Sequence, residues 1–299
     1  MQENRNRSRG RLALFITTLI WGTSFVVLKS TLNTVPVLWV LAIRFSGAAA
    51  LMFLAALRDL KKLTAPCLRG GVIMGILLFG AYVLQTYGLF HTTPGKNAFL
   101  TAVYCVIVPF FFWLIYKKKP DKYNVSAAVI CLLGVGLVSL TGDLTVSLGD
   151  ALTLLGGVFF ALHIIATSAA TAAGSPLLLT ALQMTTAGIL SWLGVIFFEP
   201  DPGVIPGNAA VAIIYLCVMC TAACFFLQTY GQKHTPPAAA AVIMTFESVF
   251  GTLLSVCLGK DKLSFQSACG FILIFAAVLI SETKLSFLKQ CGGGSSAKM

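Results

Sequence analysis

Two side chains in this sequence carry a formal charge inside long apolar segments. Arg44 lies in the segment 37–57, and Glu247 lies in the segment 238–258. A guanidinium group binds a carboxylate or phosphate through two hydrogen bonds, whereas a carboxyl group away from water can take up and release a proton. A structural ion pair or a cap on backbone carbonyls would also explain Arg44, and hydrogen-bonded packing would also explain Glu247. We therefore take Arg44 as a candidate for substrate binding and Glu247 as a candidate for proton coupling.

Other polar and aromatic side chains occupy the same kind of segment. His163 could relay a proton or form a cavity wall, although a neutral imidazole bonded to one neighbour would simply be packed. Glutamine side chains are expected to point away from lipid, either toward a substrate or toward another helix. Aromatic rings could line a cavity for an apolar solute or belong to helix packing. The candidate cavity residues are Trp21, Arg44, Tyr82, Gln85, Tyr104, His163, Gln183 and Gln228.

A stretch that contains several of these candidates occurs twice. Residues 85–104 and 228–247 both begin Gln-Thr-Tyr-Gly, and they match without a gap at a constant offset of 143. Each copy has an apolar segment, a turn with His-Thr and Pro, and a second apolar segment, which is typical of a helical hairpin. Looser matches at an offset of 139 place Arg44 opposite Gln183 and Trp21 opposite Phe160. The chain is therefore predicted to consist of two related five-helix halves, 12–140 and 150–283, followed by a flexible tail at 284–299.

Composition places both halves in a lipid bilayer. Hydrophobic residues make up 58% of the 299-residue chain, charged residues make up 10%, and the mean hydropathy is +0.90. Most of the apolar runs reach the ~20 residues that a bilayer core requires. These runs are 12–28, 37–57, 70–90, 96–116, 124–140, 150–172, 177–198, 209–231, 238–258 and 264–281. The sequence predicts an all-α integral membrane protein with ten transmembrane helices.

The distribution of lysine and arginine predicts the orientation. With the N-terminus inside, 16 of the 21 cationic residues fall in cytoplasmic segments and four, Lys29, Lys96, Lys260 and Lys262, fall outside. Both termini are therefore predicted to be cytoplasmic. The net charge of +11 comes from short clusters between apolar runs, so we expect no nucleic acid partner.

An odd number of spans in each half has a consequence for symmetry. The two halves must enter the membrane in opposite orientations, related by an axis in the membrane plane, and one half can then rock against the other. Counting ~1.5 Å per residue, the depths of Arg44 and Glu247 differ by about 6 Å. We expect these two side chains to face one cavity.

Several short motifs together resemble the EamA type of the drug/metabolite transporter superfamily. They are Trp21-Gly22-Thr23-Ser24-Phe25, Ile43-Arg44-Phe45, the two Gln-Thr-Tyr-Gly hairpins, and Phe246-Glu247-Ser248. The resemblance covers about residues 12–283. It implies an inner-membrane carrier whose central cavity is lined by helices 1 to 4 and 6 to 9, with the fifth helix of each half at the back. Members commonly have proline after the glutamate of helix 9, where this chain has Ser248.

Motifs of other functional classes are absent from the sequence. It contains no G-x4-G-K-[ST], no H-E-x-x-H and no G-x-S-x-G, so we expect no enzyme, no catalytic residue, no cofactor and no metal. The expected partners are the lipid bilayer and a small-molecule substrate. We predict a secondary active transporter of a small metabolite, such as an amino acid or a related solute, with export as the favoured direction. The alternatives are a membrane channel and a non-transporting membrane protein or enzyme.

Overall fold

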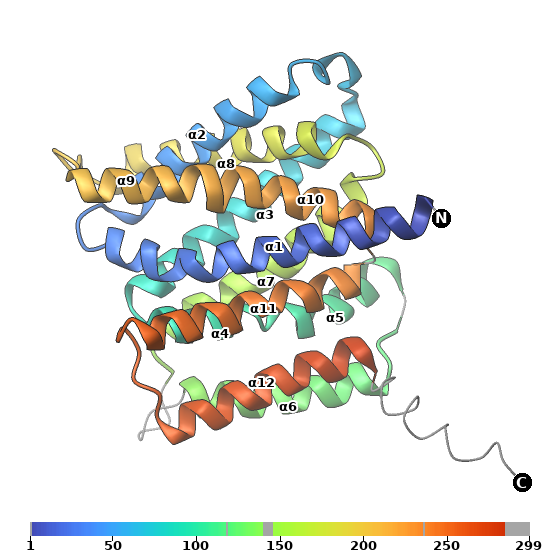
Figure 1. The fold of residues 1–299 in the computed structure, drawn as a ribbon, viewed down its shortest axis with the longest axis vertical. Coiled ribbons are helices and arrows are strands. Elements are labelled where there is room, and N and C mark those ends of the chain that lie inside the picture. Colours follow the sequence, from blue (N-terminus) through green and yellow to red (C-terminus); the bar gives the residue numbers. More distant parts are fainter. Residues whose placement is uncertain (1, 118, 140–145, 236, 285–299) are drawn as a thin grey trace, which may run out of the picture.

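The protein is built of helices that run roughly parallel and antiparallel to one another (Figure 1). The computed structural model describes residues 2–117, 119–139, 146–235 and 237–284, so the predicted tail beyond Lys284 lies outside the described residues. The first half contains α1 (Gln2–Thr31), α2 (Val37–Ala56), the 3-10 turn η1 (Leu60–Lys62), α3 (Ala65–Phe90), α4 (Pro94–Thr101), α5 (Tyr104–Tyr116) and α6 (Lys122–Ser139). The second half contains α7 (Leu148–Ala170), α8 (Pro176–Phe198), α9 (Gly207–Tyr215), the π-helical segment η2 (Leu216–Ala223), α10 (Cys224–His234), α11 (Pro237–Cys257) and α12 (Phe265–Thr283).

Seven helical segments of the described chain are long and apolar enough to cross a membrane. In this set α4 and α5 count as one segment, Pro94–Tyr116, and α9, η2 and α10 count as another, Gly207–His234. Three further apolar helices are shorter, at Lys122–Val138, Ile243–Cys257 and Phe265–Ile280. The all-α membrane class is confirmed, whereas the count of ten spans and the orientation of the termini stay predictions.

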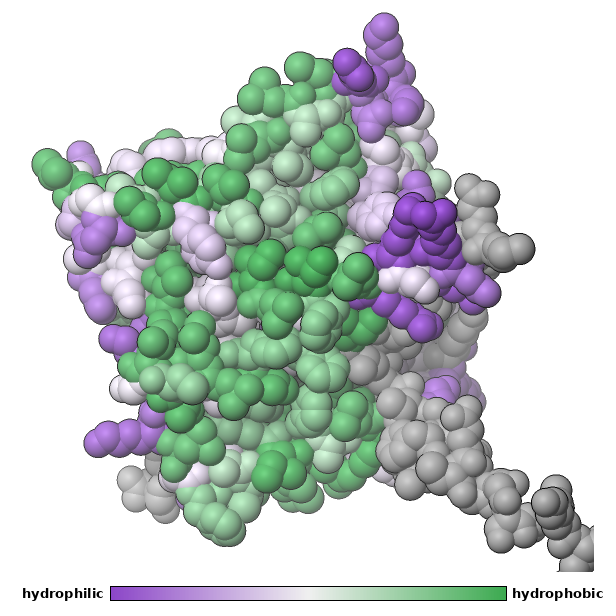
Figure 2. All heavy atoms as spheres, in the orientation of Figure 1, coloured by the Kyte–Doolittle hydropathy of each residue, from purple (hydrophilic) through white to green (hydrophobic). Residues whose placement is uncertain are grey.

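The surface supports placement in a bilayer. In Figure 2 apolar side chains cover the middle of the visible face, and hydrophilic side chains gather along its left and right sides. Many large apolar residues of the described chain are exposed, including Leu132, Ile196 and Phe198. Such a broad apolar belt is unfavourable in water and favourable against lipid tails.

Polar residues next to the apolar segments start several helices. The Ser147 hydroxyl accepts a hydrogen bond from the backbone N–H of Asp150 at 3.1 Å, and Ser175 accepts one from Leu178 at 3.3 Å. A side-chain oxygen at this position satisfies one of the unpaired N–H groups of the first turn. These caps fix where α7 and α8 begin.

Two pairs of glycines bring helices of different halves into close contact. A Cβ atom added at Gly88 would lie 2.9 Å from the carbonyl oxygen of Gly149, which joins the end of α3 to the start of α7. A Cβ atom at Gly231 would lie 2.9 Å from the carbonyl oxygen of Gly10, which joins the end of α10 to the start of α1. We call the end of the bundle near Gly10 the N-terminal end and the end near Gly149 the opposite end.

Carboxylates brace α2 against α8 at both ends. Glu199 follows α8 and accepts hydrogen bonds from the backbone N–H groups of Leu38 and Trp39 at 2.9 and 3.2 Å, in the first turn of α2. At the other end of this pair, Asp59 accepts a hydrogen bond from the hydroxyl of Ser175, the cap residue of α8, at 3.0 Å. Hydrogen bonds from Lys62 and then Ser175 hold the pKa of Asp59 below its ordinary value. Each helix of the pair is thus held by an acidic residue from the end of the other.

The helices α6 and α12 pack on each other at the edge of the bundle, at the bottom of Figure 1. Gly134 and Gly270 allow this contact, since a Cβ atom on either would lie 2.9 Å from the carbonyl oxygen of the other. Neither helix contributes a residue to the cavity described next.

Candidate functional site

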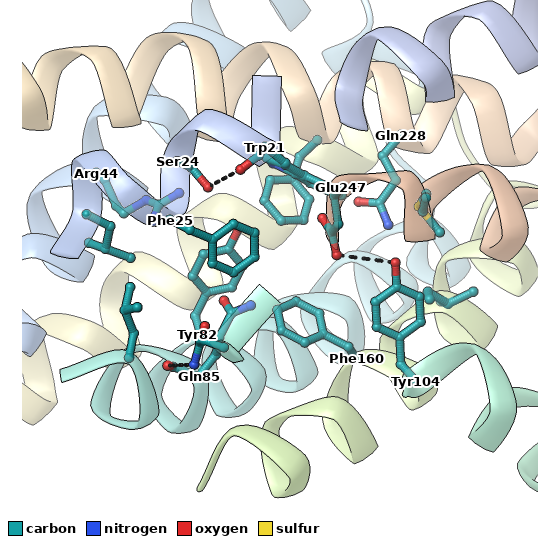
Figure 3. A pocket seen from close by; sticks show the side chains of 16 residues that line it. Trp21, Ser24, Phe25, Arg44, Tyr82, Gln85, Tyr104, Phe160, Gln228 and Glu247 are labelled. Atoms are coloured by element: carbon teal, nitrogen blue, oxygen red, sulfur yellow. Dashed lines mark hydrogen bonds between the residues drawn. The ribbon is translucent and has the colours of Figure 1, made fainter. Parts of the chain in front are cut away.

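A narrow, largely buried cavity lies between the two halves. Its empty volume is about 560 Å³, but the centre of a water-sized sphere has only about 30 Å³ in which to move. The cavity can therefore hold water as it stands, and a metabolite would need the helices to separate. Its lining consists of Trp21, Ser24, Phe25, Leu28, Arg44, Tyr82, Gln85, Leu89, Asn97, Tyr104, Phe160, Ile164, Phe225, Gln228, Met244 and Glu247 (Figure 3).

Ten of these lining residues form five pairs at the offsets found in the sequence. Three pairs are 143 residues apart and two are 139 apart. The pairs are Tyr82 with Phe225, Gln85 with Gln228, Tyr104 with Glu247, Trp21 with Phe160, and Phe25 with Ile164. Positions that the repeat matches in the two halves therefore line the same cavity.

Arg44 enters this cavity from α2 as a nearly fully buried cation, with 1% of the residue exposed. Its Nε donates a hydrogen bond to the hydroxyl of Thr221 at 2.9 Å, and its guanidinium carbon lies 4.8 Å from the ring centre of Tyr82. Within the described part of the chain, no carboxylate lies within 4.0 Å of Arg44. Because a buried charge without a counter-ion is costly, the guanidinium is a strong candidate for holding an anionic group.

The π-helical segment η2 positions two of the lining side chains. Its wider turn lets the Thr221 hydroxyl donate to the carbonyl oxygen of Leu216 at 2.8 Å while accepting from Arg44. The indole N–H of Trp21 donates to the carbonyl oxygen of Cys220 at 2.8 Å. Segments of π-helix are often found at functional sites, and this one holds the side chains of Arg44 and Trp21 in place through hydrogen bonds.

Glu247 enters the cavity from α11 and contacts its own counterpart in the first half. The hydroxyl of Tyr104 donates a hydrogen bond to Oε1 of Glu247 at 3.3 Å, and both residues are buried (Figure 3). The helix α11 continues from Pro237 to Cys257, so Ser248 allows it to pass Glu247 without the break that proline would favour. Arg44 lies toward the other side of the cavity in this view. The expected placement of Arg44 and Glu247 on one cavity thus agrees with the geometry, and they do not form an ion pair.

Amide side chains complete the polar lining. Gln85 donates from Nε2 to the hydroxyl of Thr101 at 3.0 Å, and its backbone carbonyl accepts from Asn97 at 3.2 Å. Gln228, its counterpart, leaves its buried Oε1 without a hydrogen-bond partner among the described residues. The cavity therefore offers a cation, a carboxyl group and an open amide acceptor.

Two of the candidate residues lie outside the lining. His163 and Gln183 hydrogen-bond to each other, with Nε2 of the imidazole 2.9 Å from Oε1 of the amide. Both are buried, and the His163 ring packs edge-on against the lining residue Phe225 with ring centres 6.0 Å apart. Helix α8, which carries Gln183, contributes no residue to the cavity, although the resemblance implied a lining role for this helix. The remaining candidates, Trp21, Arg44, Tyr82, Gln85, Tyr104, Gln228 and Glu247, all line it.

Sequence reasoning missed several lining residues because most of them are apolar. Phe160 and Phe225 were recoverable, since each is the counterpart of a chosen aromatic residue, Trp21 or Tyr82. Asn97 carried a weaker signal as a polar residue at the start of an apolar run. Leu28, Leu89 and Met244 are ordinary packing residues by type, and only their position makes them part of the lining.

The fold and the cavity define a class, a multi-pass membrane protein with a largely buried cavity between its halves that is mainly apolar and carries a few polar groups. The sequence profile of the EamA-like transporter family matches the chain over residues 8–140 and again over 147–283. The chain belongs to this family, and the resemblance read from the sequence is confirmed.

Several relatives agree with this assignment. An uncharacterized transporter of Archaeoglobus fulgidus is 32% identical over 294 residues, which cover 95% of this chain and 89% of that protein. The uncharacterized inner membrane transporter YedA of Escherichia coli (strain K12) is 24% identical over 283 residues, covering 92% and 91%. A crystal structure with 20% identity superposes with a TM-score of 0.70 over 94% of this chain and 99% of that chain, which shows a shared fold. The protein is therefore a membrane transporter of the multi-pass, plasma (inner) membrane type.

Proposed function

We propose that this protein is a secondary active transporter that carries a small metabolite with an anionic group and an apolar body, such as an amino acid or a related solute. The observation that carries the proposal is Arg44, a buried cation facing a cavity without a carboxylate partner in the described chain. A substrate carboxylate would supply the missing counter-charge and two hydrogen-bond acceptors. Aromatic side chains on several sides, including Trp21, Phe160 and Phe225, would surround the apolar part.

Alternating access is the mechanism that we infer from the size and position of the cavity. The cavity is too narrow for a metabolite, so binding requires one end of the bundle to open. The repeated family match and the five pairs of equivalent lining residues support two related halves around one central site. Rocking of such halves would expose the same site first to one side of the membrane and then to the other.

Glu247 supplies a group through which transport could be coupled to protons. Its carboxyl group lies on the same cavity as Arg44, so a proton on Glu247 changes the electrostatic potential that an anionic substrate meets at Arg44. Proton release on one side and uptake on the other would then couple the substrate to the proton gradient. We favour export as the direction, in keeping with the resemblance to the family.

Purified protein in proteoliposomes tests this function. Solutes that differ between cells with and without the protein would be identified first and then used for counterflow. A carrier gives saturable uptake that is accelerated by unlabelled substrate on the far side, whereas a channel gives uptake without this acceleration. The variant Arg44→Ala should abolish uptake, and Arg69→Ala, which removes an exposed arginine at the start of α3, should leave it unchanged. Equal uptake by wild type and Arg44→Ala would contradict the proposed binding role.

A further inference from the structure

Buried polar atoms that have no hydrogen-bond partner among the described residues gather beside the cavity in the second half. They include Nδ1 of His163, Nε2 of Gln183, Oγ1 of Thr167 and Oε1 of Gln232. All four residues are at most 4% exposed. Buried polar groups are nearly always satisfied in folded proteins, and each exception calls for an explanation. Four exceptions in one region indicate groups that find partners in another arrangement of the helices.

Each of these residues is the counterpart of a residue that lines the cavity in the first half. At the offset of 139, His163 corresponds to Ser24, Gln183 to Arg44, and Thr167 to Leu28; at 143, Gln232 corresponds to Leu89. Ser24, Arg44, Leu28 and Leu89 all face the cavity. Their four counterparts in the second half do not line it. At these positions the cavity is therefore lined by the first half alone.

The four residues continue the lining toward the N-terminal end. Ile164 lines the cavity from α7, and Thr167 lies three residues further along the same helix face. Gln228 lines it from α10, and Gln232 lies one turn further. Gln232 donates from Nε2 to the carbonyl oxygen of Ile164 at 3.5 Å, a long hydrogen bond that closes this region. Beyond it, the close approach of Gly10 and Gly231 joins α1 to α10.

We infer that His163, Gln183, Thr167 and Gln232 form a second polar subsite, closed in this structure, that takes up water and the polar groups of the substrate when the cavity opens toward the N-terminal end. The inference rests on the proposed function, because it needs two alternating openings. In the first half the subsite is charged, through Arg44. In the second half it is neutral, with amide, imidazole and hydroxyl groups. An anionic substrate that enters from the N-terminal end would therefore meet the neutral subsite first and be held more firmly near Arg44.

Thiol labelling tests the position of this subsite. In a background without the native cysteines, Thr167→Cys and Gln232→Cys probe the second subsite, and Leu28→Cys and Leu89→Cys probe the equivalent places in the first half. The lipid-facing Leu132→Cys sets the baseline rate. A membrane-impermeant maleimide is added to right-side-out or inverted vesicles, with or without an equimolar amino acid mixture on both sides. Uptake of radiolabelled amino acids is measured for every variant before labelling.

We expect reciprocal labelling. The thiols at positions 167 and 232 should react only from the side that carries the N-terminus, and those at 28 and 89 only from the other side. A minor conformation commonly has a population of about 0.1–10%, so the rate at 167 and 232 should rise about tenfold when substrate shifts the equilibrium toward it. If transport is detected but the thiols at positions 167 and 232 react only at the baseline rate, the inference of a second subsite is wrong, whereas the proposed transport function is unaffected. If neither the variants nor the wild-type protein transports an amino acid, the amino acid substrate is wrong, and the inference of a subsite for its polar groups fails with it.

A second pair of substitutions separates this role from a simple packing defect. The double variant Thr167→Val with Gln232→Leu removes two unpartnered atoms from the closed arrangement, so the melting temperature in detergent should rise. If the subsite is needed for opening, exchange should fall at least about tenfold while binding of a radiolabelled amino acid to purified protein persists. A higher melting temperature with unchanged exchange would mean that these residues only pack, and the inference would be wrong.

Discussion

Tyr104 and Glu247 are 143 residues apart, the offset that relates the two hairpins, and they touch each other. The Tyr104 hydroxyl donates to Oε1 of Glu247 at 3.3 Å. Two positions related by a two-fold axis can be in contact only if both lie close to that axis. This contact therefore supports a pseudo-two-fold axis that passes through the cavity beside Glu247, where a rocking motion moves atoms least.

The position of Glu247 gives a test of proton coupling. The variant Glu247→Gln keeps the shape and a hydrogen-bond acceptor but cannot titrate, so we expect binding and exchange to persist while net flux loses its pH dependence. Proteoliposomes loaded at several internal pH values measure this, with Glu199→Gln as a control glutamate outside the cavity. A wild-type rate with a wild-type pH profile in Glu247→Gln would make this residue a packing residue.

Substitutions of Arg44 are expected to separate the effect of its positive charge on substrate binding from the effect of its hydrogen-bond geometry. Arg44→Ala should lose substrate binding, and Arg44→Lys should recover only part of it because an ammonium cannot form two parallel hydrogen bonds to a carboxylate. Thr221→Val removes the acceptor that orients Nε and should weaken binding by about tenfold. Titration with labelled substrate measures these affinities, and full recovery by lysine would show that charge alone matters.

The ion pair between Lys96 and Asp150 joins the start of α4 to the start of α7. The two charged groups are 2.6 Å apart, and the Asp150 side chain is fully buried. Lys96→Met should destabilise the protein by about 2–3 kcal/mol, since it leaves a buried carboxylate unpaired, with some relief from the partial exposure of Lys96. The double variant Lys96→Met with Asp150→Asn should lose less. Thermal unfolding in one detergent compares the variants, and additive losses would show that the pair does not interact.

The close contact between Gly88 of α3 and Gly149 of α7 predicts that a larger side chain at position 88 destabilises the protein. Gly88→Ala places a methyl group 2.9 Å from the carbonyl oxygen of Gly149 and in steric conflict with the hydroxyl group of Thr153, so we expect a loss of about 1–3 kcal/mol. Gly207→Ala is a matched control because nothing lies within 4 Å of its added Cβ atom. Equal melting temperatures for the two variants would show that the helices separate at little cost.

The predicted orientation needs a direct measurement. If both termini are cytoplasmic, a fluorescent protein fused after residue 299 should fold and fluoresce, and a periplasmic phosphatase fused there should be inactive. Fusions after Lys29 and Lys260 should show the reverse. Phosphatase activity at the C-terminus would overturn the ten-span topology.

The sequence was sufficient for the features that depend on composition and on repetition. Apolar run length predicted an all-α membrane protein, and the offset of 143 singled out Gln85 and Gln228, which both line the cavity. It was not sufficient for features that depend on helix rotation. His163 and Gln183 hydrogen-bond to each other because the faces of α7 and α8 that carry them are in contact. The π-helical segment η2 precedes α10, and no residue type in the sequence predicts this wider turn.

The contact between Tyr104 and Glu247 also bears on how such a chain can arise by gene duplication. If two copies of one five-helix protein had met as a homodimer, the residue at the axis would have faced an identical residue. Two glutamates there would have to share one proton to avoid repulsion, and two tyrosines would carry no carboxyl group. In a single fused chain each of the two positions can carry a different residue, so that a donor, Tyr104, lies opposite an acceptor, Glu247. An asymmetric pair on a symmetry axis, with one titratable partner, is an arrangement that fusion permits and a homodimer of identical chains does not.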